Sequence, residues 1–90
     1  MCRNIRPLFN FSPPATDAEV RAAALQYVRK VSGTRQPSDK NASTFEHAVA
    51  EITRATRLLV DSLETTAAPK DREIEGAKAK ARSLRRFAGA

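Results

Sequence analysis

The fold of this 90-residue chain is decided by residues 45–63, which read FEHAVAEITRATRLLVDSL. Apolar and small side chains recur in this stretch every three or four residues: Phe45, Ala48, Val49, Ile52, Ala55, Thr56, Leu59, Val60 and Leu63. This spacing predicts an amphipathic α-helix with the longest apolar face in the chain. Its end is expected near Glu64 and Thr65.

Two starts fit this helix. Ser38 can cap a helix that begins at Asp39, or Ser43 can cap one with Glu46 as its capping-box partner. We favour Ser38, which gives a core helix over residues 38–65.

A second helix is expected before it, over residues 16–32. Thr16 is the predicted N-cap, Glu19 its capping-box partner, and the helix should stop at Ser32 and Gly33. Its apolar stripe consists of Val20, Ala23, Ala24, Tyr27, Val28 and Val31. Tyr27 is interpreted as a core residue with its hydroxyl at the edge.

The two helices differ in length, at roughly 24 Å and roughly 39 Å for a rise of 1.5 Å per residue. The shorter one therefore leaves part of the longer one uncovered. The N-terminal arm, residues 1–15, is expected to pack there as a strap through Ile5, Leu8, Phe9 and Phe11. Phe9 and Phe11 alternate, so in an extended arm both rings point one way, as anchors of the strap or, alternatively, as stacking surfaces for unpaired bases.

A third, basic helix is expected over residues 70–88. Its apolar stripe is narrow and rich in alanine (Ile74, Ala77, Ala81, Leu84 and Ala88), and Gly76 costs it about 1 kcal/mol against alanine. The helix either docks weakly on the core or forms only with a partner. Its open apolar face also leaves room for a homodimer.

The chain is too short for more than one domain, here residues 1–90, and its 41% hydrophobic content fits a small helical protein. The fold class expected is all-α, with two main antiparallel helices, an N-terminal strap and the basic C-terminal helix. One cysteine allows no internal disulfide, and no apolar run approaches the roughly 18 residues that cross a bilayer. We expect a bacterial, cytoplasmic protein with no membrane contact.

The formal net charge of +6 resides mostly in the third helix. Four of its cations, Lys78, Arg82, Arg85 and Arg86, fall within about a third of the helix circumference and form what we call the basic ridge. Such a ridge would bind RNA, DNA or a ribonucleoprotein in a salt-sensitive way. The simpler alternative is that these cations keep the helix soluble, with Glu75 and Lys78 paired. Arg29 and Lys30, in the last turn of the first helix, either complement the helix dipole or extend the basic surface.

Cys2 becomes the N-terminal residue if Met1 is removed, and its α-amine and Arg3 would then favour the thiolate. A nucleophilic thiol also needs an oxyanion hole and usually a base, and the only histidine, His47, lies on the polar face of the core helix. A packed or exposed thiol is the simpler interpretation. No spacing predicts a metal site, and none predicts a cofactor.

Several segments together resemble a known family: residues 1–5 (MCRNI), 13–16 (PPAT), 24–30 (ALQYVRK), Ser32-Gly33 and Pro37-Ser38. The chain is similar over nearly its whole length to small bacterial proteins known only as domain of unknown function 2277. The resemblance implies a bacterial cytoplasmic setting and brings no reaction, cofactor or catalytic residue. It marks Cys2, Arg3 and Asn4 as signature candidates.

The function favoured on these grounds is non-enzymatic binding of nucleic acid or ribonucleoprotein through the basic ridge. The alternatives are a thiol-dependent enzyme or redox protein that uses Cys2, and a helical scaffold or dimerisation module.

Overall fold

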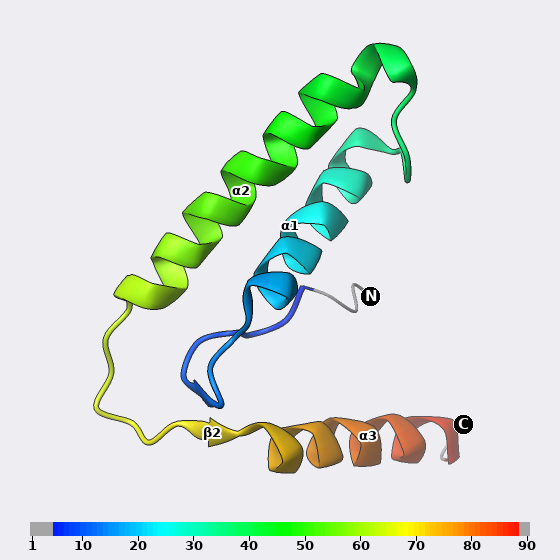
Figure 1. Ribbon diagram of the computed structural model, residues 1–90. Helices are drawn as coiled ribbons and strands as arrows, with labels where there is room; N and C mark the ends of the chain where they lie inside the picture. The colour runs from blue at the N-terminus through cyan, green and yellow to red at the C-terminus, as the bar shows by residue number, and fades with distance from the viewer. Residues whose placement is uncertain (1–4, 89–90) are drawn as a thin grey trace.

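The computed structural model describes the backbone of residues 5–88 and the side chains of residues 5–85 (Figure 1). The described elements follow the order β1 (Phe11–Ser12), α1 (Asp17–Ser32), the short 3-10 helix η1 (Asp39–Asn41), α2 (Ala42–Ser62), β2 (Lys70–Asp71) and α3 (Arg72–Ala88). The predicted helical fold class is confirmed. The two-residue strands were not predicted.

Helix α1 begins and ends where its capping residues place it. The Thr16 hydroxyl accepts a hydrogen bond from the Glu19 amide at 3.2 Å, and the Glu19 carboxylate accepts one from the Thr16 amide at 3.0 Å. At the other end Gly33 adopts φ 72°, and its N–H donates to the Arg29 carbonyl at 3.0 Å. A capping side chain of this kind stabilises a helix by about 1 kcal/mol.

Helix α2 starts through η1. Ser38 precedes η1 as its N-cap residue, without a side-chain hydrogen bond, and its carbonyl accepts from the Asn41 amide at 3.0 Å. Ser43 lies inside α2, so the alternative start is wrong.

The end of α2 lies at Ser62, earlier than the predicted Glu64–Thr65. Leu63 turns to extended backbone with ψ 140°, and its N–H closes the last turn on the Leu59 carbonyl at 3.1 Å. No basic residue lies in the last turn of α2, and Asp61 places a carboxylate at the negative end of the helix dipole. The β-branched Thr65 and Thr66 favour helix continuation little.

Two small clusters of buried side chains form the core. In the first, Ala24 and Val28 of α1 pack with Phe45 and Val49 of α2. Figure 1 shows the two helices side by side, joined by the segment that contains η1. The second cluster joins Leu8, Ala15 and Val20, with Val60 of α2 against it.

The N-terminal arm joins the core through Leu8, which is buried, whereas Ile5 is 46% exposed and is not an anchor. The expected alternation of Phe9 and Phe11 is wrong, because Asn10 between them has φ 65° and bends the arm. Both rings are half-buried.

Beyond the bend, β1 pairs in parallel with β2, Phe11 opposite Lys70 and Ser12 opposite Asp71. The Lys70 amide donates to the Asn10 carbonyl at 2.8 Å, and the Asn10 side chain donates to the carbonyls of Ala67 and Ala68. The arm is thus tied to the segment that leads into α3.

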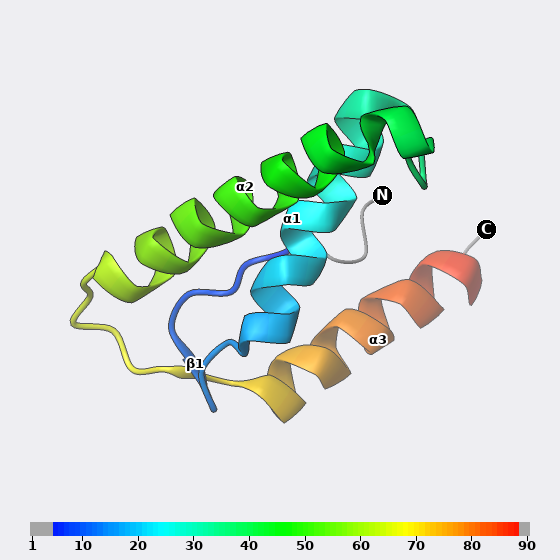
Figure 2. The ribbon, with the colours of Figure 1, turned by 45° about the horizontal axis from the view of Figure 1, so that its top comes forward.

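Helix α3 stands apart from α1 and α2 (Figures 1 and 2). Ile74 and Leu84 of its apolar stripe are 56% and 61% exposed. The radius of gyration of the chain is 15.9 Å, against about 12 Å for a compact domain of this length. The segment is helical here, with its apolar stripe uncovered. In the described part of the chain, no helix has the length and apolarity to cross a membrane.

Candidate functional site

The start of α3 is held by a group of side chains around Glu19, which we call the Glu19 cluster (Glu19, Arg6, Thr16 and Arg72). Glu19 forms ion pairs with Arg72 from α3 and, at 3.1 Å, with Arg6 from the arm. Arg72 also donates to the carbonyl of Pro13 at 2.7 Å. One carboxylate therefore joins α1, the arm and α3.

The pKa of Glu19 reflects these contacts. The hydrogen bond from Arg72 and the backbone N–H of Thr16 lower the pKa of the carboxyl from 4.5 to about 2, and partial burial opposes them. The side chain is 18% exposed. Glu19 is ionised at any physiological pH and holds both guanidinium groups.

The basic ridge extends along α3 beyond this cluster. Lys78 pairs with Glu75 at 3.1 Å, the pair expected under the simpler alternative, and stays 62% exposed. Arg82 lines a cavity of about 330 Å³ between α3 and the arm, together with Arg6, Phe11 and Glu75. Arg85 is exposed, and Arg86 lies in α3 with its side chain outside the described part. Two described ridge cations, Lys78 and Arg85, are therefore exposed, Lys78 within its ion pair with Glu75, and Arg82 faces the cavity.

The other predicted basic residues lie in the last turn of α1. The Arg29 side chain donates to the carbonyl of Arg35 at 2.9 Å, which holds the turn after the helix, and Lys30 is exposed. Helix α3 starts beside the first turn of α1, where Glu19 pairs with Arg72, at the opposite end from the last turn that carries Arg29 and Lys30 (Figure 1). The structure does not merge the two groups into one surface.

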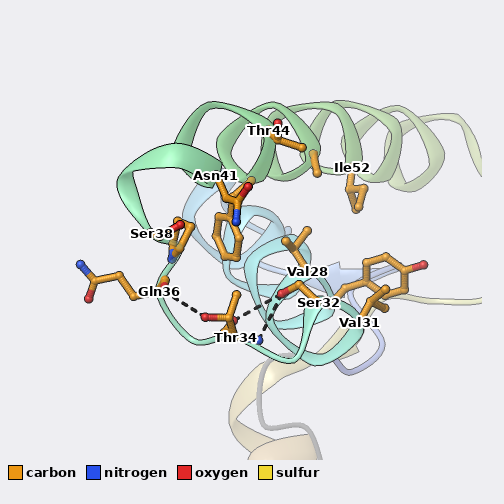
Figure 3. A pocket seen from close by; sticks show the side chains of 13 residues that line it. Val28, Val31, Ser32, Thr34, Gln36, Ser38, Asn41, Thr44 and Ile52 are labelled. Carbon is orange, nitrogen blue, oxygen red and sulfur yellow. Dashed lines mark hydrogen bonds between the residues drawn. The ribbon is translucent and has the colours of Figure 1, made fainter.

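An apolar groove that the sequence did not predict opens between the last turns of α1 and the first turns of α2. Its volume is about 950 Å³, and its apolar lining consists of Tyr27, Val28, Val31, Phe45, Ala48 and Ile52. Figure 3 shows Val28 and Val31 across from Ile52, with Ser38, Asn41 and Thr44 at one end. We call this the interhelical groove.

The groove overturns one expectation from the sequence. Tyr27 is 49% exposed and Val31 is 69% exposed, so neither is a core residue. Both belong to the apolar stripe of α1, but α2 covers only the side of the stripe that carries Ala24 and Val28. The apolar stripe of α1 is wider than its one neighbour can cover.

The signature candidates Cys2, Arg3 and Asn4 lie outside the described residues. His47 is exposed, and Glu51, one turn further along α2, pairs with Arg54 at 2.7 Å. That contact lowers the pKa of Glu51. In residues 5–88, no three His, Cys, Asp or Glu side chains gather as a metal site.

Sequence reasoning also missed Arg72 and Arg57. Arg57 of α2 pairs with Asp61 at 2.6 Å and donates to the Ala15 carbonyl at 3.0 Å, which ties α2 to the start of α1. The contacts that join them to other segments, Arg57 with Ala15 and Arg72 with Glu19 and Pro13, lie more than 40 residues apart in the sequence, beyond the reach of periodicity.

Comparison with known proteins gives a family and no further relatives. No curated protein matches the chain, and no solved structure does. Residues 1–78 match a family described as an uncharacterized conserved protein (DUF2277). The match includes the arm, the Glu19 cluster, both helices of the core and the start of α3, and it ends before Arg82. It confirms the resemblance seen in the sequence, and the chain belongs to the DUF2277 family.

Proposed function

We propose that this chain is a non-enzymatic binding protein of the bacterial cytoplasm that contacts RNA, DNA or a ribonucleoprotein through the basic ridge of α3. The observation that carries the proposal is the position of α3, which projects from the core (Figure 2) and carries the exposed cations Lys78 and Arg85. At 17 residues α3 is roughly 25 Å long, enough to lie along several phosphates.

The anchoring of α3 supports this function. Arg72 and the β1–β2 pair fix the start of the helix, so its cations are held at a set position relative to the core. A fixed array loses less conformational entropy on binding than a flexible basic tail does. Contacts of this kind read the phosphate backbone and are tolerant of sequence.

The ridge beyond Lys78 lies outside the residues matched to the family. The binding function is therefore proposed for this chain and not for the family as a whole.

A salt titration tests the proposal. Binding of mixed-sequence RNA and DNA, followed by fluorescence anisotropy, is expected to weaken with salt along a log–log slope of about −2 to −4, as for three or four neutralised phosphates. Replacing Arg82 and Arg85 by glutamine should reduce this slope in magnitude by about two.

The matched control replaces Arg21 and Arg54 by glutamine. These residues form exposed ion pairs with Glu46 and Glu51 outside α3, and their loss changes the net charge by the same amount. An equal effect of the two double variants would show a general charge effect, and no binding at low salt would remove the proposed function.

A thiol-dependent role for Cys2 stays a prediction. Mass spectrometry of the mature protein tests its first requirement, because retention of Met1 leaves no N-terminal cysteine. An alkylation rate with the pH dependence of an ordinary thiol would argue against an activated one.

A further inference from the structure

Two apolar surfaces of this chain lie uncovered. One is the α3 stripe, which comprises Ile74, Ala77, Ala81 and Leu84, all exposed. The other runs from the interhelical groove along α2 through the partly or fully exposed Ala48, Ile52, Ala55 and Leu59. Exposed apolar surfaces of this extent mark interaction sites in small proteins.

The α3 stripe does not cover the groove of its own chain. The side of α3 toward the body of the molecule carries Arg72, Glu75 and Arg82, which line the cavity beside the arm. At 100° per residue, the stripe lies on nearly the opposite side of the helix. Because Arg72 and the strand pair fix the start of α3, the stripe points away from the core.

We infer that the α3 stripe of each chain packs on the interhelical groove and the adjoining face of α2 in a second copy, so that two chains exchange their third helices. The contact is reciprocal, as a two-fold symmetric dimer requires. The occupant of the groove is thus a segment of the same sequence.

The dimensions of the two surfaces fit each other. From Ile74 to Leu84 the stripe is about 15 Å long, and the open face of α2 from Ala48 to Leu59 is about 17 Å long. Alanine at the centre of both surfaces lets two helices approach closely. No charged side chain lines the groove in the described part of the chain, so the basic helix meets no buried cation there.

The exposed area of the chain points to the same partner. The chain exposes 7244 Å², whereas a compact monomer of 9.9 kDa exposes about 5200 Å². The excess of about 2000 Å² per chain exceeds the roughly 800 Å² that each partner buries in a standard interface, and is of the size found in obligate dimers. A second copy removes this excess without any further component.

Dimerisation through exchanged α3 helices leaves the basic ridge, the proposed nucleic-acid-binding surface, free. Lys78 and Arg85 lie beside the stripe and not within it, so they stay at the edge of the contact. Dimerisation and nucleic-acid binding are therefore separate properties, and the failure of one leaves the other standing.

Light scattering of the size-fractionated protein tests the inference. The wild-type chain is expected at twice its monomer mass of 9.9 kDa. Ile74→Glu and Val31→Lys should each give monomers, one by charging the stripe and the other by charging the groove. Both sites are more than half exposed, and the new charges complement the dipoles at the ends of their helices, so each monomer should remain helical.

The matched controls are Ser83→Glu on α3 and Ala50→Lys on α2, which place the same charges on exposed sites off the two surfaces. Both should stay dimeric. An equimolar mixture of Ile74→Glu and Val31→Lys should form some heterodimer, because one of the two exchanged contacts is then intact.

Three outcomes would overturn the inference. A wild-type monomer at concentrations up to about 100 μM, well above the range of stable dimers, removes it. A dimer that Val31→Lys leaves intact while Ile74→Glu disrupts it would show α3 paired with α3. A dimer that both variants leave intact would place the interface elsewhere.

Discussion

At the scale of single residues, Glu19 has the largest number of roles. It closes the capping box of α1 and holds Arg6 and Arg72 at once. Glutamine at this position can still accept from the Thr16 amide, so Glu19→Gln keeps the cap and removes the charge. The substitution separates the two roles of the side chain.

We predict that Glu19→Gln lowers the free energy of unfolding by about 1–2 kcal/mol at pH 7, a value reduced for screening of a partly exposed pair. The folded-state pKa of about 2 lies below the reference value of 4.5. The stabilisation is therefore complete above 4.5 and is lost as the pH falls through about 2. Urea unfolding of wild type and variant should converge over this interval.

The control for this measurement is Glu64→Gln, at an exposed carboxylate beyond α2. An equal pH dependence of the two variants would contradict the role given to Glu19. Hydrogen exchange of the Lys70 amide offers a second measurement. Loss of the Glu19–Arg72 ion pair should loosen the β1–β2 pair, so this amide should exchange with solvent faster in Glu19→Gln.

At the scale of the elements, the sequence predicted the features that depend on contacts between residues close together in the chain. The capping box of Thr16 and Glu19 and the glycine at position 33 fixed both ends of α1, because each works through contacts within four residues. The pairing of β1 with β2 was not predictable. Each strand has only two residues and no alternating pattern, and the contact joins residues about 60 positions apart.

The exposure of Tyr27 and Val31 was missed for a related reason. Periodicity shows which residues share a face of a helix, but not how many neighbours cover that face. The interhelical groove was hidden for the same reason. The contacts of Arg72 with Pro13 and of Arg57 with Ala15 could not be predicted either, because these residues become neighbours only after the chain folds.

Two glycines should respond to alanine with opposite signs. Gly33 has φ 72° and Gly76 is helical, and an added Cβ would meet nothing within 4 Å at either site. Gly33→Ala should therefore destabilise the protein by about 1 kcal/mol through its backbone alone. Gly76→Ala should stabilise the helical state of α3 by about 1 kcal/mol and so raise its helix content.

Thermal unfolding and far-ultraviolet circular dichroism measure the two effects. Each variant serves as the control of the other, since the substitution is the same and only the backbone conformation differs. A stabilising Gly33→Ala would contradict the left-handed cap.

At the scale of the whole molecule, the open shape follows from a division of the chain into a helical pair and a projecting helix (Figures 1 and 2). The two buried clusters contain seven buried side chains among the described residues, most of them alanine or valine. A core of that size stabilises a domain weakly. An isolated monomer should therefore be marginal.

We predict that the midpoint of thermal unfolding rises with protein concentration, because a partner that binds only the folded chain stabilises it by mass action. Wild type should show the rise, and Val31→Lys should show a midpoint that is lower and independent of concentration. A midpoint of the wild-type chain that does not change over a hundredfold range of concentration would argue for a monomer.

The contact between Asn10 and Lys70 has a consequence for the order of folding. It closes a loop of about 60 residues, and the entropy cost of closing a loop grows with its length. Helices α1 and α2, joined by a short connection, can assemble first; α3 acquires its direction only when this distant pair forms. The orientation of the third helix is then the last feature to be established on folding and the first to be lost on mild denaturation.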